Sequence, residues 1–220
     1  MMKANERVVS LGVSGIRSDP LFSDHIMEVV PVPKAGTKTL SRLPAFDPAN
    51  DDLLAVIETP KGSPNKYDFD EESRAFRLAA VMPEGTTFPY DFGFIPSTLG
   101  EDGDPLDVLV LLDAPVVVGC LVTVRLIGVI EAEQRDAGGK WIRNDRLIAV
   151  ATHAHTHQHI GSLEGLRPHM LDEVEDFFVH YNEMKGKEFR PLKRRGPKKA
   201  RKLVDRGMTA LQASRSGRKS

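Results

Sequence analysis

Residues Asp102-Gly103-Asp104-Pro105-Leu106-Asp107 directly precede the apolar run from Val108 to Leu112. Gly103 and Pro105 favour a tight turn, and the apolar run indicates a buried strand. Three carboxylates this close together repel one another unless cations neutralise them. Carboxylate oxygens suit hard cations such as Mg²⁺, Mn²⁺ and Ca²⁺, although the spacing is not that of an EF-hand loop. The stretch therefore has two interpretations, a divalent metal site and a solvated acidic turn.

Short β-strands are predicted on both sides of this turn. Apolar or alternating runs separated by Gly, Pro and Asp indicate strands near 53–57, 66–70, 76–82, 88–94, 121–130 and 147–151. Farther along, apolar residues recur at helical spacing between Met170 and Met184, and Gly186 is a plausible stop. A second helix is expected to start at Pro197. The pattern predicts an α+β fold, mainly β, in which a small barrel is flanked by two C-terminal helices.

The chain is expected to contain one folded domain. Residues 1–52 have no sustained apolar period and are predicted to be an N-terminal extension, 53–212 the domain, and 213–220 a basic tail. The longest strictly apolar run has five residues, whereas a membrane span needs about 20, so no membrane association is expected. There is no apolar core of a secretory signal, and the one cysteine, Cys120, excludes an intrachain disulfide. A cytoplasmic location is predicted.

The formal net charge of −1 conceals a division of charge along the chain. Residues 1–184 contain 16 basic and 29 acidic residues, whereas 185–220 contain 14 basic and 2 acidic ones. The basic run 193–202 has three interpretations: a solvated helix, a rim that pairs with acidic surface of a partner subunit, or a nucleic-acid contact. Nucleic-acid binding is the least favoured, because aromatic residues for base stacking are missing around the run.

Four histidines alternate with other residues from His153 to His159. In an extended chain they would project to one side, where imidazoles can bind Zn²⁺, Ni²⁺ or Cu²⁺. A surface loop that follows a strand is the favoured interpretation.

The acidic stretch and its surroundings resemble the soluble family I inorganic pyrophosphatases. Residues 102–108 resemble the family's signature at every position, and further matches follow in the right order between about 53 and 211. These matches are Val56-Ile57-Glu58-Thr59-Pro60, Lys66-Tyr67-Asp68, Phe92-Gly93-Phe94-Ile95-Pro96 and the segment from Phe177 to Lys187. The resemblance implies a five-stranded OB-like barrel, a homo-oligomer, and Mg²⁺-dependent hydrolysis of pyrophosphate to two phosphates, with Mn²⁺ or Zn²⁺ as alternative metals.

The resemblance also implies roles for individual residues. The implied metal ligands are Asp102, Asp104, Asp107 and Asp145. Asp104 would also orient or deprotonate the attacking water, and Glu58 would hold a metal-bound water. The implied contacts to phosphoryl oxygens are Lys66, Arg146 and Tyr181. This assignment is consistent with the reaction, because splitting an anhydride of phosphate requires charge neutralisation and an activated water.

Several positions that are functional in the family carry other residues here. They are Ala80 in place of an arginine, Phe88 and Phe92 in place of tyrosines, Gln134 and Asn144 in place of acidic ligands, and Asn182 in place of a lysine. Arg77 lies three residues before Ala80, so a regular strand would direct it to the other face. Either Asn144 occupies the ligand position or Asp145 does after a one-residue adjustment. The alternatives to pyrophosphate hydrolysis are hydrolysis of another phosphoanhydride, and a weakened protein that retains phosphate or polyanion binding.

Overall fold

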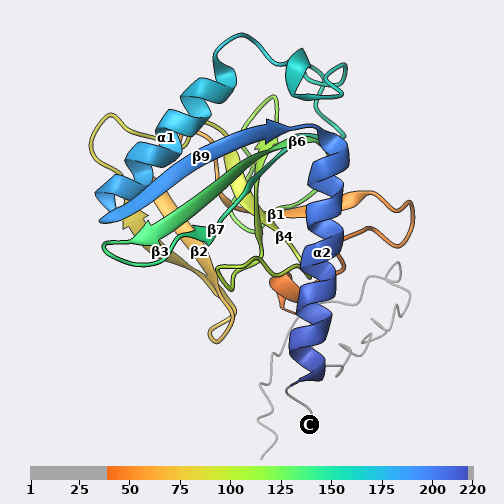
Figure 1. Ribbon diagram of the computed structural model, residues 1–220. Helices are drawn as coiled ribbons and strands as arrows, with labels where there is room; N and C mark the ends of the chain where they lie inside the picture. The colour runs from red at the N-terminus through yellow and green to blue at the C-terminus, as the bar shows by residue number, and fades with distance from the viewer. Residues whose placement is uncertain (1–38, 218–220) are drawn as a thin grey trace, which may run out of the picture. The chain divides into compact units, whose positions relative to one another are not determined.

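The structure is a computed structural model and describes residues 39–217 (Figure 1). Five strands close a ring in the order β1, β4, β5, β8, β6 and back to β1. Their bounds are β1 Leu53–Thr59, β4 Asp91–Ile95, β5 Leu106–Leu111, β6 Leu121–Asp136 and β8 Arg146–Ala151. Strands β5 and β8 are parallel, and the other neighbours in the ring are antiparallel. The predicted mainly β fold with a five-stranded ring is confirmed.

Burial of both strand faces explains why the sequence of the ring is almost continuously apolar. All seven residues of β1 are buried, as are all five of β4 and all six of β8. Strands β1 and β4 lie unusually close together, since a Cβ atom on Gly93 would come within 1.9 Å of the Val56 carbonyl oxygen. Glycine is therefore required at position 93, because the backbone of β1 leaves no space for a side chain there.

Strand β6 extends well beyond the predicted end at residue 130. Its second half leaves the ring and pairs with the two-residue strand β7 (Ile142–Arg143) and with β9 (Lys187–Arg195). Strand β9 was not predicted. Phe189 is its one buried residue, so the alternating apolar pattern of a half-buried strand is absent. Opposite charges face each other across β6 and β9 instead, in the pairs Glu131–Lys193, Glu133–Arg190, Arg135–Glu188 and Asp136–Lys187. We call these four pairs the charge ladder.

Two helices pack on the outside of the strands, as predicted. Helix α1 (Met170–Met184) lies along β9, and α2 (Pro197–Ser216) packs on β6 (Figure 1). Helix α1 ends before Gly186, whose φ of +69° lets the chain turn back into β9, and α2 begins with a proline, whose missing N–H costs nothing at that position. Short 3₁₀ helices span Leu40–Arg42 and Leu163–Gly165. Within residues 39–217, no helix is both long and apolar enough to cross a membrane.

A separate hairpin covers one end of β1. It consists of β2 (Asn65–Asp70) and β3 (Ala75–Val81), and β1 contacts β2. The ladder between them pairs Lys66 with Ala80 but Tyr67 with Leu78, so Ala79 is an extra residue in β3. Such a bulge changes which residues of the bulged strand share a face.

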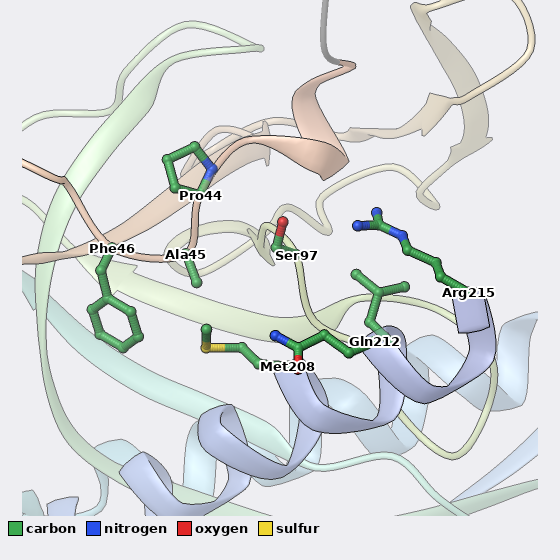
Figure 2. Close-up of a pocket in the computed structure, with 8 residues that line it drawn as sticks. Pro44, Ala45, Phe46, Ser97, Met208, Gln212 and Arg215 are labelled. Atoms are coloured by element: carbon green, nitrogen blue, oxygen red, sulfur yellow. The ribbon is translucent and has the colours of Figure 1, made fainter.

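The residues before β1 pack on the same body as the ring. Ala45 is buried, and Phe46 forms a bridge with Leu53. Figure 2 shows Ala45 and Phe46 beside Met208 of α2, in a pocket of about 300 Å³ that contains none of the predicted site residues. The described part of the predicted extension, 39–52, thus contributes to packing, and 1–38 lie outside the described residues. The predicted tail differs as well, because α2 continues through residue 216.

Candidate active site

The acidic turn forms the connection between β4 and β5, where the structure orders three carboxylates around one bend. Gly103 adopts a φ of +95°, and the backbone N–H of Asp104 donates to Asp102 Oδ1 at 3.3 Å. The Gly100 N–H donates to the Asp104 carbonyl oxygen at 2.7 Å and closes the turn. Asp107 lies one residue into β5, so its position is fixed by the ring.

Neighbouring charge and loss of solvent both oppose ionisation of these carboxyl groups. Burial, with Asp107 as the next contributor, raises the pKa of Asp102 to about 6. Burial and the Asp68 carboxylate raise the pKa of Asp104. Burial also raises the pKa of Asp107, although Arg146 and Lys66 act in the opposite direction. Loss of solvent is thus the main reason why these carboxyl groups resist ionisation, and neighbouring carboxylates add to it.

A buried lysine links β1 to the hairpin. Lys66 Nζ lies 3.2 Å from Glu58 Oε2, donates to the Tyr67 carbonyl oxygen at 2.6 Å and contacts Asp68 Oδ1. Burial alone would lower the pKa of Lys66, but Glu58 and Asp68 more than compensate and raise it. Burial raises the pKa of Glu58 despite Lys66, and the Phe69 N–H donates to Glu58 Oε1 at 2.9 Å. The ammonium group therefore remains charged next to the acidic turn.

Aromatic rings pack beside Lys66. Its Nζ lies 5.0 Å from the Phe92 ring centroid, and the Phe92 ring packs 5.7 Å from that of Phe88. Tyr181 from α1 packs against Phe88 at 5.6 Å, and Lys185 donates to the Tyr181 hydroxyl at 3.3 Å. Tyr181 acts electrostatically on Lys66, so these two predicted substrate contacts lie near each other.

Arg146, at the start of β8, is 4% exposed and points into the same group. Its Nη1 lies 2.5 Å from Asp107 Oδ2 and also contacts Asn144 Oδ1. The guanidinium packs on the adjacent rings of Phe178 and Phe189, with centroid distances of 4.8 and 5.1 Å. Its Nε is buried without a hydrogen-bond partner among the described residues.

Asp145 lies outside this group. Its Oδ1 accepts from the Ala132 N–H at 2.9 Å and from Arg143 Nη2 at 2.6 Å. Arg143 also lies 3.7 Å from Glu131, which places Asp145 beside the charge ladder. Of the two alternatives left by the sequence, Asn144 is therefore the residue connected to Asp107, through Arg146.

The chemistry of the donor set fits a divalent cation on one side of the site. Burial and nearby carboxylates oppose ionisation of Asp102, Asp104 and Asp107, and a hard cation would favour their charged forms. In the described part of the chain, no three His, Cys, Asp or Glu side chains already converge on a single metal position. On the side of Arg146, the available oxygens are occupied by the guanidinium, so that side does not fit a metal ion.

Known proteins resemble this chain in both sequence and fold. The family model described as inorganic pyrophosphatase matches residues 55–212. The inorganic pyrophosphatase of a Nostoc species is 37% identical over 173 residues, which cover 79% of this chain and 99% of that protein. The chain belongs to the inorganic pyrophosphatase family. The Thermus thermophilus inorganic pyrophosphatase structure superimposes with a TM-score of 0.72 at 34% identity, covering 80% of this chain and 99% of that one.

A second solved member of the pyrophosphatase family gives the same result. The Helicobacter pylori inorganic pyrophosphatase has a TM-score of 0.67 at 30% identity, and the match covers 82% of this chain and 99% of that one. The predicted family and OB-like fold are confirmed. This family depends on metal ions in general, and pyrophosphate is its substrate.

The bulge in β3 corrects one inference from the sequence about the pyrophosphatase site. Because Ala79 is extra, Arg77 pairs with Asp68 while Ala80 pairs with Lys66. Directly paired residues of an antiparallel ladder share a face, and Lys66 and Asp68 contact each other. Arg77 therefore lies on the face of Lys66, not on the opposite one.

The other departures from the family pattern are all accommodated by packing. Phe88 and Phe92 are buried, so neither lost hydroxyl leaves a gap. Asn182 is also buried, and its amide donates to the Phe178 carbonyl oxygen at 2.8 Å, which turns it back onto its own helix. Gln134 lies on β6 between β7 and β9. These positions contribute no charge to the site.

Lys187 is a further candidate site residue that was not predicted from the sequence. It lies at the start of β9, lowers the pKa of Asp104 and forms an ion pair of 3.2 Å with Asp136. Gly186 is the sequence feature that could have indicated this residue. It reverses the chain after α1 and brings Lys187 near the acidic turn.

The histidine segment is not extended. Residues 152–159 form successive turns, in which Asp113 accepts from the N–H groups of His155 and Thr156 at 2.7 and 3.0 Å. The segment is a surface loop that follows β8, which agrees with the favoured interpretation.

Proposed function

We propose that this chain hydrolyses inorganic pyrophosphate to two phosphates with Mg²⁺ as its metal. The observation that carries the proposal is the acidic turn, whose three carboxylates lie with raised pKa values beside the charged Lys66 in a pyrophosphatase fold. Divalent ions bound there would neutralise the substrate and lower the pKa of the attacking water. The family comparisons favour hydrolysis over a protein that only binds phosphate.

Each site residue has a task that follows from its position. Asp104 is the most exposed carboxylate of the turn and is free to orient water and accept its proton. Asp102 and Asp107 hold metal. Glu58 fixes Lys66 from the buried side, while the Asp68 side chain on its other side is 55% exposed. An incoming phosphoryl oxygen can therefore replace Asp68 on Lys66 without disturbing Glu58.

Two further groups complete the binding side of the site. Tyr181 presents its hydroxyl together with Lys185, and Arg77 extends from the face that carries Lys66. Both arrangements place donors or positive charge where a phosphate dianion needs them. We also propose Mn²⁺ or Zn²⁺ as substitute metals, assembly as a homo-oligomer, and a cytoplasmic location, all of which rest on the family resemblance.

Phosphate release from pyrophosphate tests the proposal. The wild-type chain should release phosphate with Mg²⁺, and Asp104→Asn should lower the rate by about 100-fold or more, because the amide cannot accept the proton. Asp205→Asn is the matched control, since Asp205 lies on the exposed surface of α2, where its ion-pair partner is Arg201. Its rate should equal that of the wild type.

The outcomes separate the alternatives. Failure of the wild type to release phosphate with Mg²⁺, Mn²⁺, Zn²⁺ or Co²⁺ contradicts hydrolysis of this substrate. Release from another phosphoanhydride, in the absence of release from pyrophosphate, would replace the proposed substrate and keep the proposed chemistry.

A further inference from the structure

Four oxygen atoms surround a single nitrogen of Arg146. Its Nη1 contacts Asp107 Oδ2 at 2.5 Å, the carbonyl oxygens of Asn144 and Asp145 at 3.3 Å each, and Asn144 Oδ1 at short range. One guanidinium nitrogen carries only two N–H groups, so four acceptors exceed what it can satisfy. An oxygen shell of this kind requires an explanation beyond one ion pair.

The composition of the shell is that of a hard-cation site. It combines one carboxylate, one side-chain amide carbonyl and two backbone carbonyls, and these are ligand types that divalent cations such as Mg²⁺ and Ca²⁺ take. Asn144 contributes no charge, so the positive charge of Arg146 faces one carboxylate here. The guanidinium also packs on the adjacent rings of Phe178 and Phe189.

We propose that the Arg146 guanidinium occupies a cation position between Asp107 and Asn144 and thereby excludes a divalent metal ion from it. The exchangeable metal then binds on the other side of Asp107, toward Asp102 and Asp104. Arg146 is accordingly a positioning residue that holds Asp107, rather than a contact to a phosphoryl oxygen. The inference rests on the proposed metal-dependent function and concerns how many cations the site takes.

Counting bound Mn²⁺ tests this without substrate. Free Mn²⁺ is measured by electron paramagnetic resonance in titrations of wild type and Arg146→Met, a variant that removes the charge and keeps an apolar side chain against the rings of Phe178 and Phe189. We expect Arg146→Met to bind about one more Mn²⁺ per chain than the wild type. Adding Asn144→Asp should tighten this additional site. An unchanged or smaller number of bound ions in a folded Arg146→Met chain overturns the proposal.

Arg143→Met is the matched control. Arg143 pairs with Asp145 and Glu131 outside the oxygen shell, so its loss should leave the Mn²⁺ count at the wild-type value. An equal gain in this control would show a general charge effect and overturn the proposal.

A second measurement uses the wild-type chain, and it decides the question if Arg146→Met does not fold. The side-chain ¹⁵N signals of Arg146 should stay in place and retain their slow exchange at saturating Mg²⁺, whereas displacement of the guanidinium by metal would shift them and overturn the proposal. Neither measurement uses pyrophosphate. If Arg146→Met gains Mn²⁺ as expected but the wild type releases no phosphate from pyrophosphate, the proposed function fails and this inference stands.

Discussion

The carboxylates of the acidic turn and two glutamates of the charge ladder have pKa values shifted in opposite directions. In the turn, burial and like charge raise the pKa values of Asp102, Asp104 and Asp107. In the ladder, Arg135 lowers the pKa of Glu188 through hydrogen bonds of 2.8 and 2.9 Å. Ladder charges are paired with neighbours in the same chain, whereas Asp102 and Asp104 of the turn form no ion pair within residues 39–217. Unbalanced charge therefore marks the site, and balanced charge marks the scaffold.

Glu131 illustrates how the charges of the scaffold are neutralised by neighbouring residues. Its burial favours the neutral form, but Lys199, Arg143 and Arg195, at 3.3 to 3.7 Å, outweigh burial and lower its pKa. Arg194 likewise pairs with Asp172 and Glu175 of α1. Part of the basic segment that follows residue 185 is thus paired with acidic residues of its own chain, through Lys187, Arg190, Arg194, Arg195, Lys199 and Arg201.

The largest effect on stability is expected at the ion pair between Asp107 and the buried Arg146. Asp107→Ala leaves Arg146 buried without its carboxylate partner, so the free energy of unfolding should fall by about 3 kcal/mol. Urea unfolding of the metal-free chain measures this loss. A loss below about 1 kcal/mol would mean that the pair contributes no more than a surface ion pair.

Removing a ladder charge should cost less and leave catalysis intact. Glu131→Gln leaves three partly exposed cations without their carboxylate, and we expect the free energy of unfolding to fall by about 1–2 kcal/mol. Phosphate release should remain within about twofold of the wild type, since such a loss leaves the chain folded. Loss of activity without loss of stability would break the distinction between scaffold and site.

Titration should separate the two regions directly. Carboxyl ¹³C shifts of the metal-free chain should give a midpoint of about 6 for Asp102 and one below 4.5 for Glu131. The folded chain holds the Asp102 proton more tightly than the unfolded chain, so this group destabilises the fold as pH rises from 3.8 to about 6. Glu131 does the reverse, because its contribution is present above pH 4.5 and is lost as pH falls below that value.

Mg²⁺ provides the check on that titration. Metal binding should lower the midpoint of Asp102 and leave that of Glu131 where it is. A shift of Glu131 similar to that of Asp102 would contradict a metal position at the acidic turn.

The smallest effect is expected on the outer face of α2. Arg201 and Asp205 form an exposed pair one helical turn apart, and their side chains are 50% and 54% exposed. Asp205→Asn should change the free energy of unfolding by about 0.5 kcal/mol or less. A melting temperature close to that of the wild type confirms this, and a larger change would indicate that α2 depends on surface charge.

The parts of the fold that bury apolar surface could be predicted from the sequence. The runs of β1 and β8 and the stripe of α1 are visible without neighbours. Strand β9 could not be predicted, because its stability comes from charges on β6, more than 50 residues earlier, and their pairing depends on register.

The candidate site, too, could be predicted from the sequence only in part. The family and its activity were predicted from the acidic stretch and are confirmed by the comparisons. The sequence also names the carboxylates, but it cannot show that Arg146 points inward to Asp107 or that Asp145 turns toward Arg143. Those directions are set by strand pairing and by the aromatic rings around Arg146. The assigned roles of the site residues stay predictions.

The extra residue at Ala79 has a consequence for how members of this family are compared with one another. Column by column, the position of Ala80 counts as a lost arginine, and Arg77 counts as an unrelated surface residue. In the ladder, however, Arg77 faces Asp68 directly and keeps a positive charge on the side of Lys66. A gain or loss of function inferred from alignment columns alone would miss an arginine that has moved along the chain without leaving its face.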